Sequence, residues 1–169
     1  MMHTQTISAG EELADLISEM DQKYLNSIDT LCSKGSCLLP PVSSDYYSNY
    51  CLSLIALAEQ HLRLSRISWI PYLLELLDKE DVGHDCRSCF NACTIRHTAQ
   101  VAGILQSHKE IQASLGLLSA ITPPYSKVAD EQHQLIQTLA NTLAAMISTE
   151  EQKMIPLIRQ VQEAIHAHG

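Results

Sequence analysis

The feature that most constrains this chain is the spacing of its apolar residues, which recur every three or four positions through four long segments. That period places them on one face of an α-helix and leaves polar side chains on the other face. Stretches with proline, glycine and serine separate the segments. We therefore predict an all-α fold, an antiparallel up-down-up-down four-helix bundle that forms a single domain over residues 1–169.

Capping residues and helix breakers set the expected helix ends. Ser8 and Glu11 have the spacing of a capping box at the start of the first helix. We expect this helix to end near Leu31, because Gly35 and the pair Pro40-Pro41 then favour a loop. The other helices are expected from Ser44 or Asp45 to about 77 with a kink at Pro71, at about 86–121, and at about 126–167 with a bend at Pro156.

Charge and composition exclude several classes of function. The net charge is -8, with 11 basic against 19 acidic residues and no basic cluster, so nucleic acid is a poor partner. Neither a secretory signal nor a membrane-spanning run is apparent, which favours a soluble cytoplasmic protein without a membrane partner. No nucleophile-base set or phosphate loop suggests a hydrolase, and we expect a role that is not primarily enzymatic. The outer faces of the long helices leave homodimerisation open.

The third segment carries the first indication of function. Positions spaced by three or four residues from 86 to 118 share one helix face, and the C-terminal half of this stripe is apolar core. Cys93, His97 and His108 should therefore point inward as well. The full stripe comprises Cys86, Cys89, Cys93, His97, Val101, Ile104, His108, Ile111, Leu115 and Leu118.

Equivalent stripes on the second and fourth segments direct His61 and Glu150 inward. With a rise of about 1.5 Å per residue, His61 and His108 come to similar heights in the bundle. Imidazole and carboxylate groups are common ligands of transition metals. We therefore expect His61, His108 and Glu150 to form one metal site in the middle of the bundle.

Cys86, Cys89, Cys93 and His97 form a Cys-x2-Cys-x3-Cys-x3-His run. Such donors suit zinc or an iron-sulfur cluster, but one continuous helix does not easily wrap four of them around one ion. A further ligand or an unwound first turn is needed, and the candidates for that ligand are His84, His166 and His168. Thiol redox chemistry and simple packing remain the alternative readings, because a helix N-terminus favours thiolate and cysteine is often buried.

Cys32, Cys37 and Cys51 are expected at the opposite end of the bundle, with His133 nearby. Loop cysteines of this spacing could form a bridge or bind a metal. His133 by itself is better explained as a hydrogen-bonded residue of the core or of a helix end.

Three segments resemble the hemerythrin-like (HHE cation-binding) domain family. Residues 59–71, with His61, resemble that family's His-x3-Glu element followed by an apolar residue and proline. Residues 146–156, with Glu150, repeat the pattern, and residues 107–111 resemble the family's third-helix histidine segment. Together these matches span most of the chain.

The resemblance implies a four-helix bundle that holds a non-haem di-iron centre and binds oxygen or responds to oxygen, nitric oxide or iron. His61, His108 and Glu150 match family ligands, whereas Ser65 stands in place of a glutamate and Met146 in place of a histidine. The main hypothesis is therefore a hemerythrin-like protein that binds metal or senses redox state. The alternatives are a metal-free bundle acting as an interaction or regulatory module, and a thiol-based redox protein.

Overall fold

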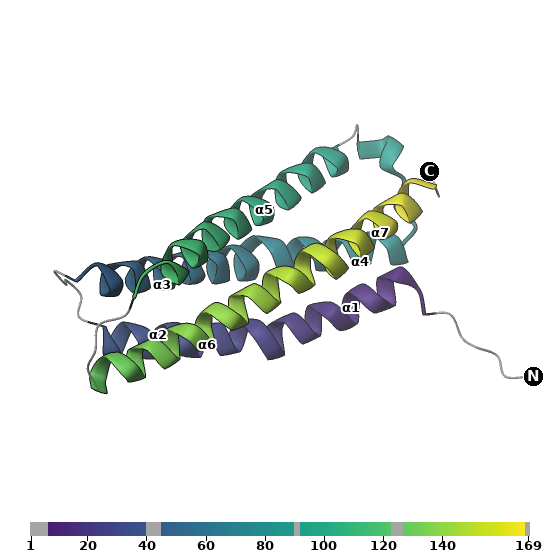
Figure 1. Ribbon diagram of the computed structural model, residues 1–169. Coiled ribbons are helices and arrows are strands. Elements are labelled where there is room, and N and C mark those ends of the chain that lie inside the picture. Colours follow the sequence, from purple (N-terminus) through teal and green to yellow (C-terminus); the bar gives the residue numbers. More distant parts are fainter. Residues whose placement is uncertain (1–6, 40–44, 90–91, 123–126, 168–169) are drawn as a thin grey trace, which may run out of the picture.

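The structure is a computed structural model that describes residues 7–39, 45–89, 92–122 and 127–167, and all regular structure in these ranges is helical. The helices form four long runs (Figure 1). The first two runs consist of α1 (Ala9–Glu19), a π-helical segment (Met20–Leu25) and α2 (Asn26–Leu38), then α3 (Tyr46–Leu64), a π-helical segment (Ser65–Trp69) and α4 (Ile70–Asp81). The last two consist of a 3-10 turn (Cys86–Cys89) and α5 (Ala92–Ser119), then α6 (Lys127–Thr149), a π-helical segment (Glu150–Met154) and α7 (Ile155–Ala167).

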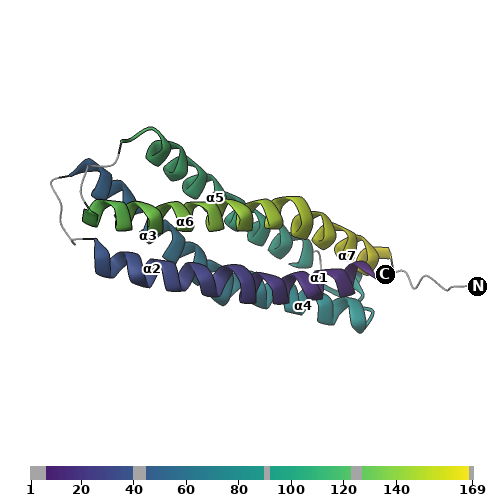
Figure 2. The same cartoon turned by 60° about the horizontal axis from the view of Figure 1, so that its bottom comes forward.

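The four runs pack along their lengths. Helix α1 contacts α4 and α7, α2 contacts α3 and α6, and α3 contacts α5. Figure 2 shows α2 and α6 side by side along one flank of the molecule. The turn between α4 and α5 lies at the same end of the bundle as the start of α1 and the end of α7 (Figure 1). These contacts are compatible with the expected up-down-up-down bundle.

Two predicted helix starts are confirmed by their hydrogen bonds. The Glu11 backbone N–H donates to Ser8 Oγ at 3.1 Å, and the Ser8 N–H donates to Glu11 Oε2 at 2.9 Å, which completes the capping box. Asp45 caps α3 by accepting from the N–H groups of Tyr47 and Ser48. Other residues at predicted helix ends lie outside the described ranges: Pro40, Pro41, Ser44 and Ser126.

The predicted end of the first helix at Leu31 is wrong, since helix continues to Leu38. Cys32 lies in the core, and Gly35 is buried against α3. A Cβ atom on Gly35 would lie 2.6 Å from Cδ1 of Ile55. The glycine therefore marks a close approach of two helices, which outweighs its poor helix propensity.

The predicted start of the third helix at Cys86 is also wrong. Cys86 and Cys89 belong to a separate 3-10 turn, and α5 begins at Ala92. A 3-10 helix has three residues per turn, so the i, i+3 spacing of these cysteines fits it as well as an α-helix. The helix ends at Ser119, within two residues of the prediction.

Three of the four runs contain a π-helical segment, and such segments occur frequently at functional sites. Two of them contain buried polar residues, Ser65 and Glu150, that face the centre of the bundle. Pro71 and Pro156, at which bends are expected, are each the second residue of the α-helix that follows one of these segments. Because the helical run is continuous, each proline lacks the N–H that would otherwise bond to the preceding turn.

The core is built mostly of leucine, isoleucine and methionine around Trp69, which is 1% exposed. The core also contains buried polar side chains, among them His61, His108 and Glu150, which form the candidate site described below. Among the described residues, no helix is both long and apolar enough to span a membrane.

Candidate metal centres

The structure brings together the three residues predicted for the central site. His61 comes from α3, His108 from α5 and Glu150 from the π-helical segment of the fourth run. One ligand atom from each lies within 4.8 Å of the others, and no side chain of the three is more than 1% exposed. His108 Nε2 is 2.6 Å from Glu150 Oε2, while His61 Nε2 is 3.5 Å from the same oxygen. The predicted mid-bundle meeting of the two histidines is confirmed.

The outer nitrogen of each imidazole is held by a neighbouring side chain. His61 Nδ1 is 2.9 Å from Ser107 Oγ, and His108 Nδ1 is 2.9 Å from Glu151 Oε1. Both rings therefore turn Nε2 toward Glu150. Histidines that bind metals commonly have the second ring nitrogen bonded to a carboxylate, a backbone carbonyl or water. Here a carboxylate does so for His108, and a serine hydroxyl takes that place for His61.

Several buried polar atoms around the centre have no hydrogen-bond partner in the described part of the chain: His61 Nε2, Glu150 Oε1, Ser65 Oγ and Trp69 Nε1. Leaving a buried donor or acceptor unsatisfied costs about 1–3 kcal/mol. A hydrogen-bonded core would not retain such a group of atoms for stability alone. A cation between His61, His108 and Glu150 would satisfy two of them directly.

Electrostatics favours the ionised form of the central carboxylate. Burial would raise the pKa of Glu150, but the hydrogen bond with His108 and the nearby imidazole of His61 outweigh burial and hold the pKa below its usual value. For His108, burial lowers the pKa, and the bonds to Glu150 and Glu151 more than offset this and leave it raised. The site thus presents a negative oxygen to any bound cation, and a metal bound at Nε2 of His108 would compete with a proton for that nitrogen.

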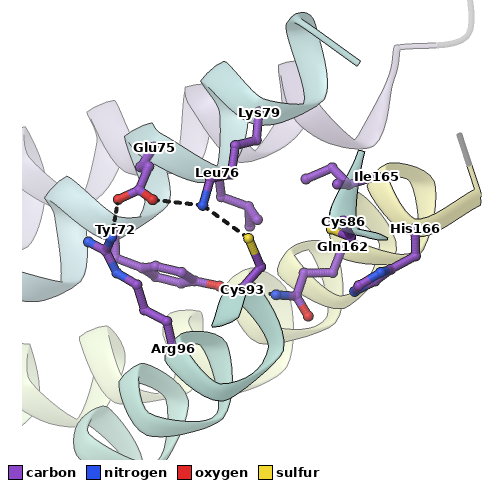
Figure 3. A pocket seen from close by; sticks show the side chains of 10 residues that line it. All are labelled: Tyr72, Glu75, Leu76, Lys79, Cys86, Cys93, Arg96, Gln162, Ile165 and His166. Carbon is purple, nitrogen blue, oxygen red and sulfur yellow. Dashed lines mark hydrogen bonds and ion pairs between the residues drawn. The ribbon is translucent and has the colours of Figure 1, made fainter. Parts of the chain in front are cut away.

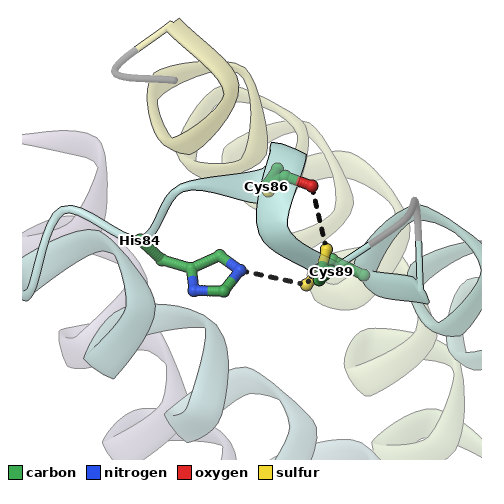
Figure 4. Close-up of side chains that lie close together, drawn as sticks. His84, Cys86 and Cys89 are labelled. Atoms are coloured by element: carbon green, nitrogen blue, oxygen red, sulfur yellow. Dashed lines mark hydrogen bonds between the residues drawn. The ribbon is translucent and has the colours of Figure 1, made fainter.

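A second group of donors lies at the end of the bundle where α1 starts and α7 ends (Figure 1). His84, Cys86, Cys89 and Cys93 each place one ligand atom within 4.8 Å of the others. The Sγ atoms of Cys89 and Cys93 are 3.4 Å apart, and His84 Nε2 is 3.5 Å from Cys93 Sγ. Figure 4 shows His84 reaching toward the 3-10 turn that carries Cys86 and Cys89.

The prediction that His97 completes the cysteine group is wrong. His97 is not among the donors that converge with the cysteines, and its Nδ1 instead lies 2.6 Å from the hydroxyl of Tyr72. His84 takes its place, which was one of the three candidates for an additional ligand. His166 is outside the group of donors, and His168 lies outside the described residues. The sequence analysis also allowed for an unwound first turn of the third helix, and the 3-10 turn at Cys86–Cys89 corresponds to it.

Two of the cysteines in this group differ in acidity. Hydrogen bonding by His84, then by Cys93, lowers the pKa of Cys89 to about 6. Burial, and then the neighbouring thiols, raise the pKa of Cys86. All six cysteines of the chain are free thiols.

The third group of cysteines does not converge. Cys32 and Cys51 are buried, whereas Cys37 is exposed on α2. Burial raises the pKa of Cys32 to about 12 and that of Cys51 to about 11, as expected of inert thiols. The ring of His133 is hydrogen-bonded to the Tyr47 hydroxyl at 2.7 Å, as expected for a satisfied histidine. Within the described ranges these residues form no metal-ligand group.

Sequence reasoning missed the residues that orient the central histidines, Ser107 and Glu151. Each stands directly beside a predicted ligand in the sequence, so adjacency to His108 and Glu150 was the available signal. Nothing in the sequence predicts that the buried Nε1 of Trp69 has no hydrogen-bond partner among the described residues. No family model, curated protein or solved structure matches this chain.

Proposed function

We propose that this protein binds one transition-metal ion in its core through His61, His108 and Glu150, and uses the ion to respond to a small gas or to redox state. One observation carries the proposal: both imidazoles are anchored at Nδ1 and direct Nε2 toward the same carboxylate oxygen. Ser107 and Glu151 thus orient the two imidazole rings, while His61 Nε2 and Glu150 Oε1 have no hydrogen-bond partner among the described residues.

Iron(II) is the metal that we favour. Two histidines and one carboxylate with open positions are the ligand set of mononuclear non-haem iron, and zinc uses the same residue types in some enzymes. The three ligands occupy positions that match the hemerythrin-like pattern. Ser65 and Met146 supply neither the carboxylate nor the imidazole that a second ion would need, so the proposal is one ion instead of two. The helix contacts are compatible with the up-down-up-down bundle predicted from the four amphipathic segments.

Burial limits what the open positions of such an ion could bind. His61, His108 and Glu150 are at most 1% exposed, and the surrounding core is apolar. Only a small neutral molecule such as oxygen or nitric oxide fits this setting without desolvating a charge. Ser65 lies one helical turn beyond His61, and its unpartnered hydroxyl is available as a hydrogen-bond donor. These features support gas or redox response over turnover of a large substrate.

The test is the metal content of protein purified anaerobically without an affinity tag. We expect iron in the wild type, a nitrosyl-iron spectrum on exposure to nitric oxide, and loss of both in His61→Ala/His108→Ala. His133→Ala is the matched control, because it removes a hydrogen-bonded histidine that lies away from the central site, near the start of α6.

Two results would contradict this proposal. Equal iron content in wild type and the double variant would place the metal elsewhere. Fully helical wild type that takes up no metal at this site would favour the metal-free interaction module.

A further inference from the structure

We propose that His84, Cys86, Cys89 and Cys93 form a second, independent site that holds a structural zinc ion at the connection between α4 and α5. Zinc in structural sites takes four thiolate or imidazole ligands in a tetrahedron, including three cysteines with one histidine. With Zn–S bonds of about 2.3 Å, tetrahedral geometry puts sulfur atoms about 3.7 Å apart. The Cys89 and Cys93 sulfurs are 3.4 Å apart, and His84 Nε2 is 3.5 Å from Cys93 Sγ.

The backbone positions each of these ligands. Helix α4 ends in a Schellman motif, in which the N–H of His84 donates to Lys79 O at 3.0 Å and that of Gly83 donates to Glu80 O at 3.1 Å. Gly83 has a φ of 62°, which turns the chain so that His84 lies beside the cysteines. The 3-10 turn then stacks Cys86 and Cys89, and Cys93 projects from the first turn of α5.

The charge around the site also suits a zinc-thiolate centre. One Zn²⁺ with three thiolates and a neutral imidazole carries a net negative charge, which needs a nearby cation. Lys79 Nζ is 3.3 Å from Cys93 Sγ, and Glu75 holds Lys79 in place at 2.7 Å. Arg96 contacts the other oxygen of Glu75 at 2.6 Å, which completes the network shown in Figure 3. Outer partners of this kind orient ligands and tune metal affinity.

Part of the site lines a small pocket. Cys86 and Cys93 border a space of about 10 Å³ together with Leu76, Ile165 and polar side chains that include Lys79. All four ligands are half-buried. Partial shielding protects thiolates from exchange and oxidation, as a structural site requires.

The four ligands complete the coordination of zinc and leave no open position, in contrast to the three ligands of the central site. Because all four lie within ten residues, a bound ion would tie the end of α4 to the start of α5. The site is thus expected to contribute to stability, and its metal should differ from that of the core. The expected contribution to stability does not depend on whether the central site binds iron.

The test is titration of the reduced, chelator-treated full-length protein with cobalt(II) and then zinc(II). We expect wild type to show the visible bands of tetrahedral cobalt with thiolate-to-cobalt charge transfer, which zinc then displaces. Cys93→Ser and His84→Ala should each weaken zinc binding by more than about 100-fold, beyond the loss of about 10–100-fold typical of an outer-partner change. Lys79→Met should fall within that smaller range.

Two controls separate this site from the rest of the protein. Cys37→Ser removes an exposed cysteine and should leave the titration unchanged. His61→Ala/His108→Ala should also retain the cobalt spectrum, since it affects only the core. Helicity is measured for every variant, and His84→Ala provides the readout if Cys93→Ser does not fold.

Several results would overturn the zinc site. Unchanged cobalt bands in both Cys93→Ser and His84→Ala would exclude these ligands. An iron-sulfur cluster in the purified protein would assign another cofactor to the cysteines. A Cys89–Cys93 disulfide that persists in protein isolated under reducing, zinc-containing conditions would favour the thiol redox reading.

Discussion

Removing His108 alone should destabilise the metal-free protein strongly. His108→Leu deletes the group that lies 2.6 Å from Glu150 Oε2 and leaves a carboxylate that is 1% exposed. The remaining histidine, His61, is 3.5 Å from that oxygen. Breaking a buried charge pair by removing one partner costs about 3–5 kcal/mol, because the other charge stays buried without compensation.

Removing both members of the pair should cost far less. In His108→Leu/Glu150→Met, apolar side chains of similar volume replace the imidazole and the carboxylate, and the contact between His61 and Ser107 is retained. Such replacements are neutral or stabilising by about 1–4 kcal/mol. The double variant should therefore be more stable than the His108→Leu single variant, and should equal or exceed the metal-free wild type.

Urea unfolding in the presence of chelator, followed by circular dichroism, measures these differences. An m-value that stays constant among the variants would show that the free energies of unfolding are comparable. Iron should stabilise only the wild type, by about 2.7 kcal/mol at a hundredfold excess over the dissociation constant. A double variant that is several kcal/mol less stable than metal-free wild type would refute the reasoning, because the polar residues would then be structural.

Three further predictions concern single positions. Gly83→Ala should lower the free energy of unfolding by about 1–2 kcal/mol in urea titrations, because its φ of 62° is strained for any residue with a Cβ. Asp45→Ala should cost about 1 kcal/mol at pH 7 through loss of the α3 cap. Backbone hydrogen bonds lower the pKa of Asp45, so its stabilising effect is present above the usual 3.8 and should vanish in unfolding curves as pH falls through the lowered value. In native protein, a thiol reagent should modify Cys37 readily but reach Cys32 and Cys51 only after unfolding, because both are buried with raised pKa values.

The central site was readable from the sequence because helical periodicity determines which residues share a face. That rule placed His61, His108 and Glu150 inward, and all three are fully buried together. The period does not determine ring orientation. The contacts of Ser107 and Glu151 with the outer imidazole nitrogens depend on side-chain rotamers that no spacing rule specifies.

The errors arose where packing or helix type outweighed local sequence signals. Gly35 has poor helix propensity, yet the helix continues through it because its missing side chain permits close packing on Ile55. His97 shares the stripe of the cysteines, but the 3-10 turn moves Cys86 and Cys89 off the axis of α5 and toward His84. At Gly35, long-range packing outweighed local helix propensity. At the cysteine group, a change in helix type altered which residues lie together, in a way that α-helical periodicity does not predict.

The most direct test of a metal ion in the core is X-ray absorption at the iron edge, on a Cys86→Ser/Cys89→Ser/Cys93→Ser variant loaded anaerobically with iron(II). This variant retains His61, His108 and Glu150 but lacks the thiols of the second site. The account predicts a first shell of nitrogen and oxygen at about 2.0–2.2 Å, the range of histidine and carboxylate ligands, with outer-shell scattering from two imidazole rings. A spectrum of hydrated iron without imidazole scattering would contradict the central claim.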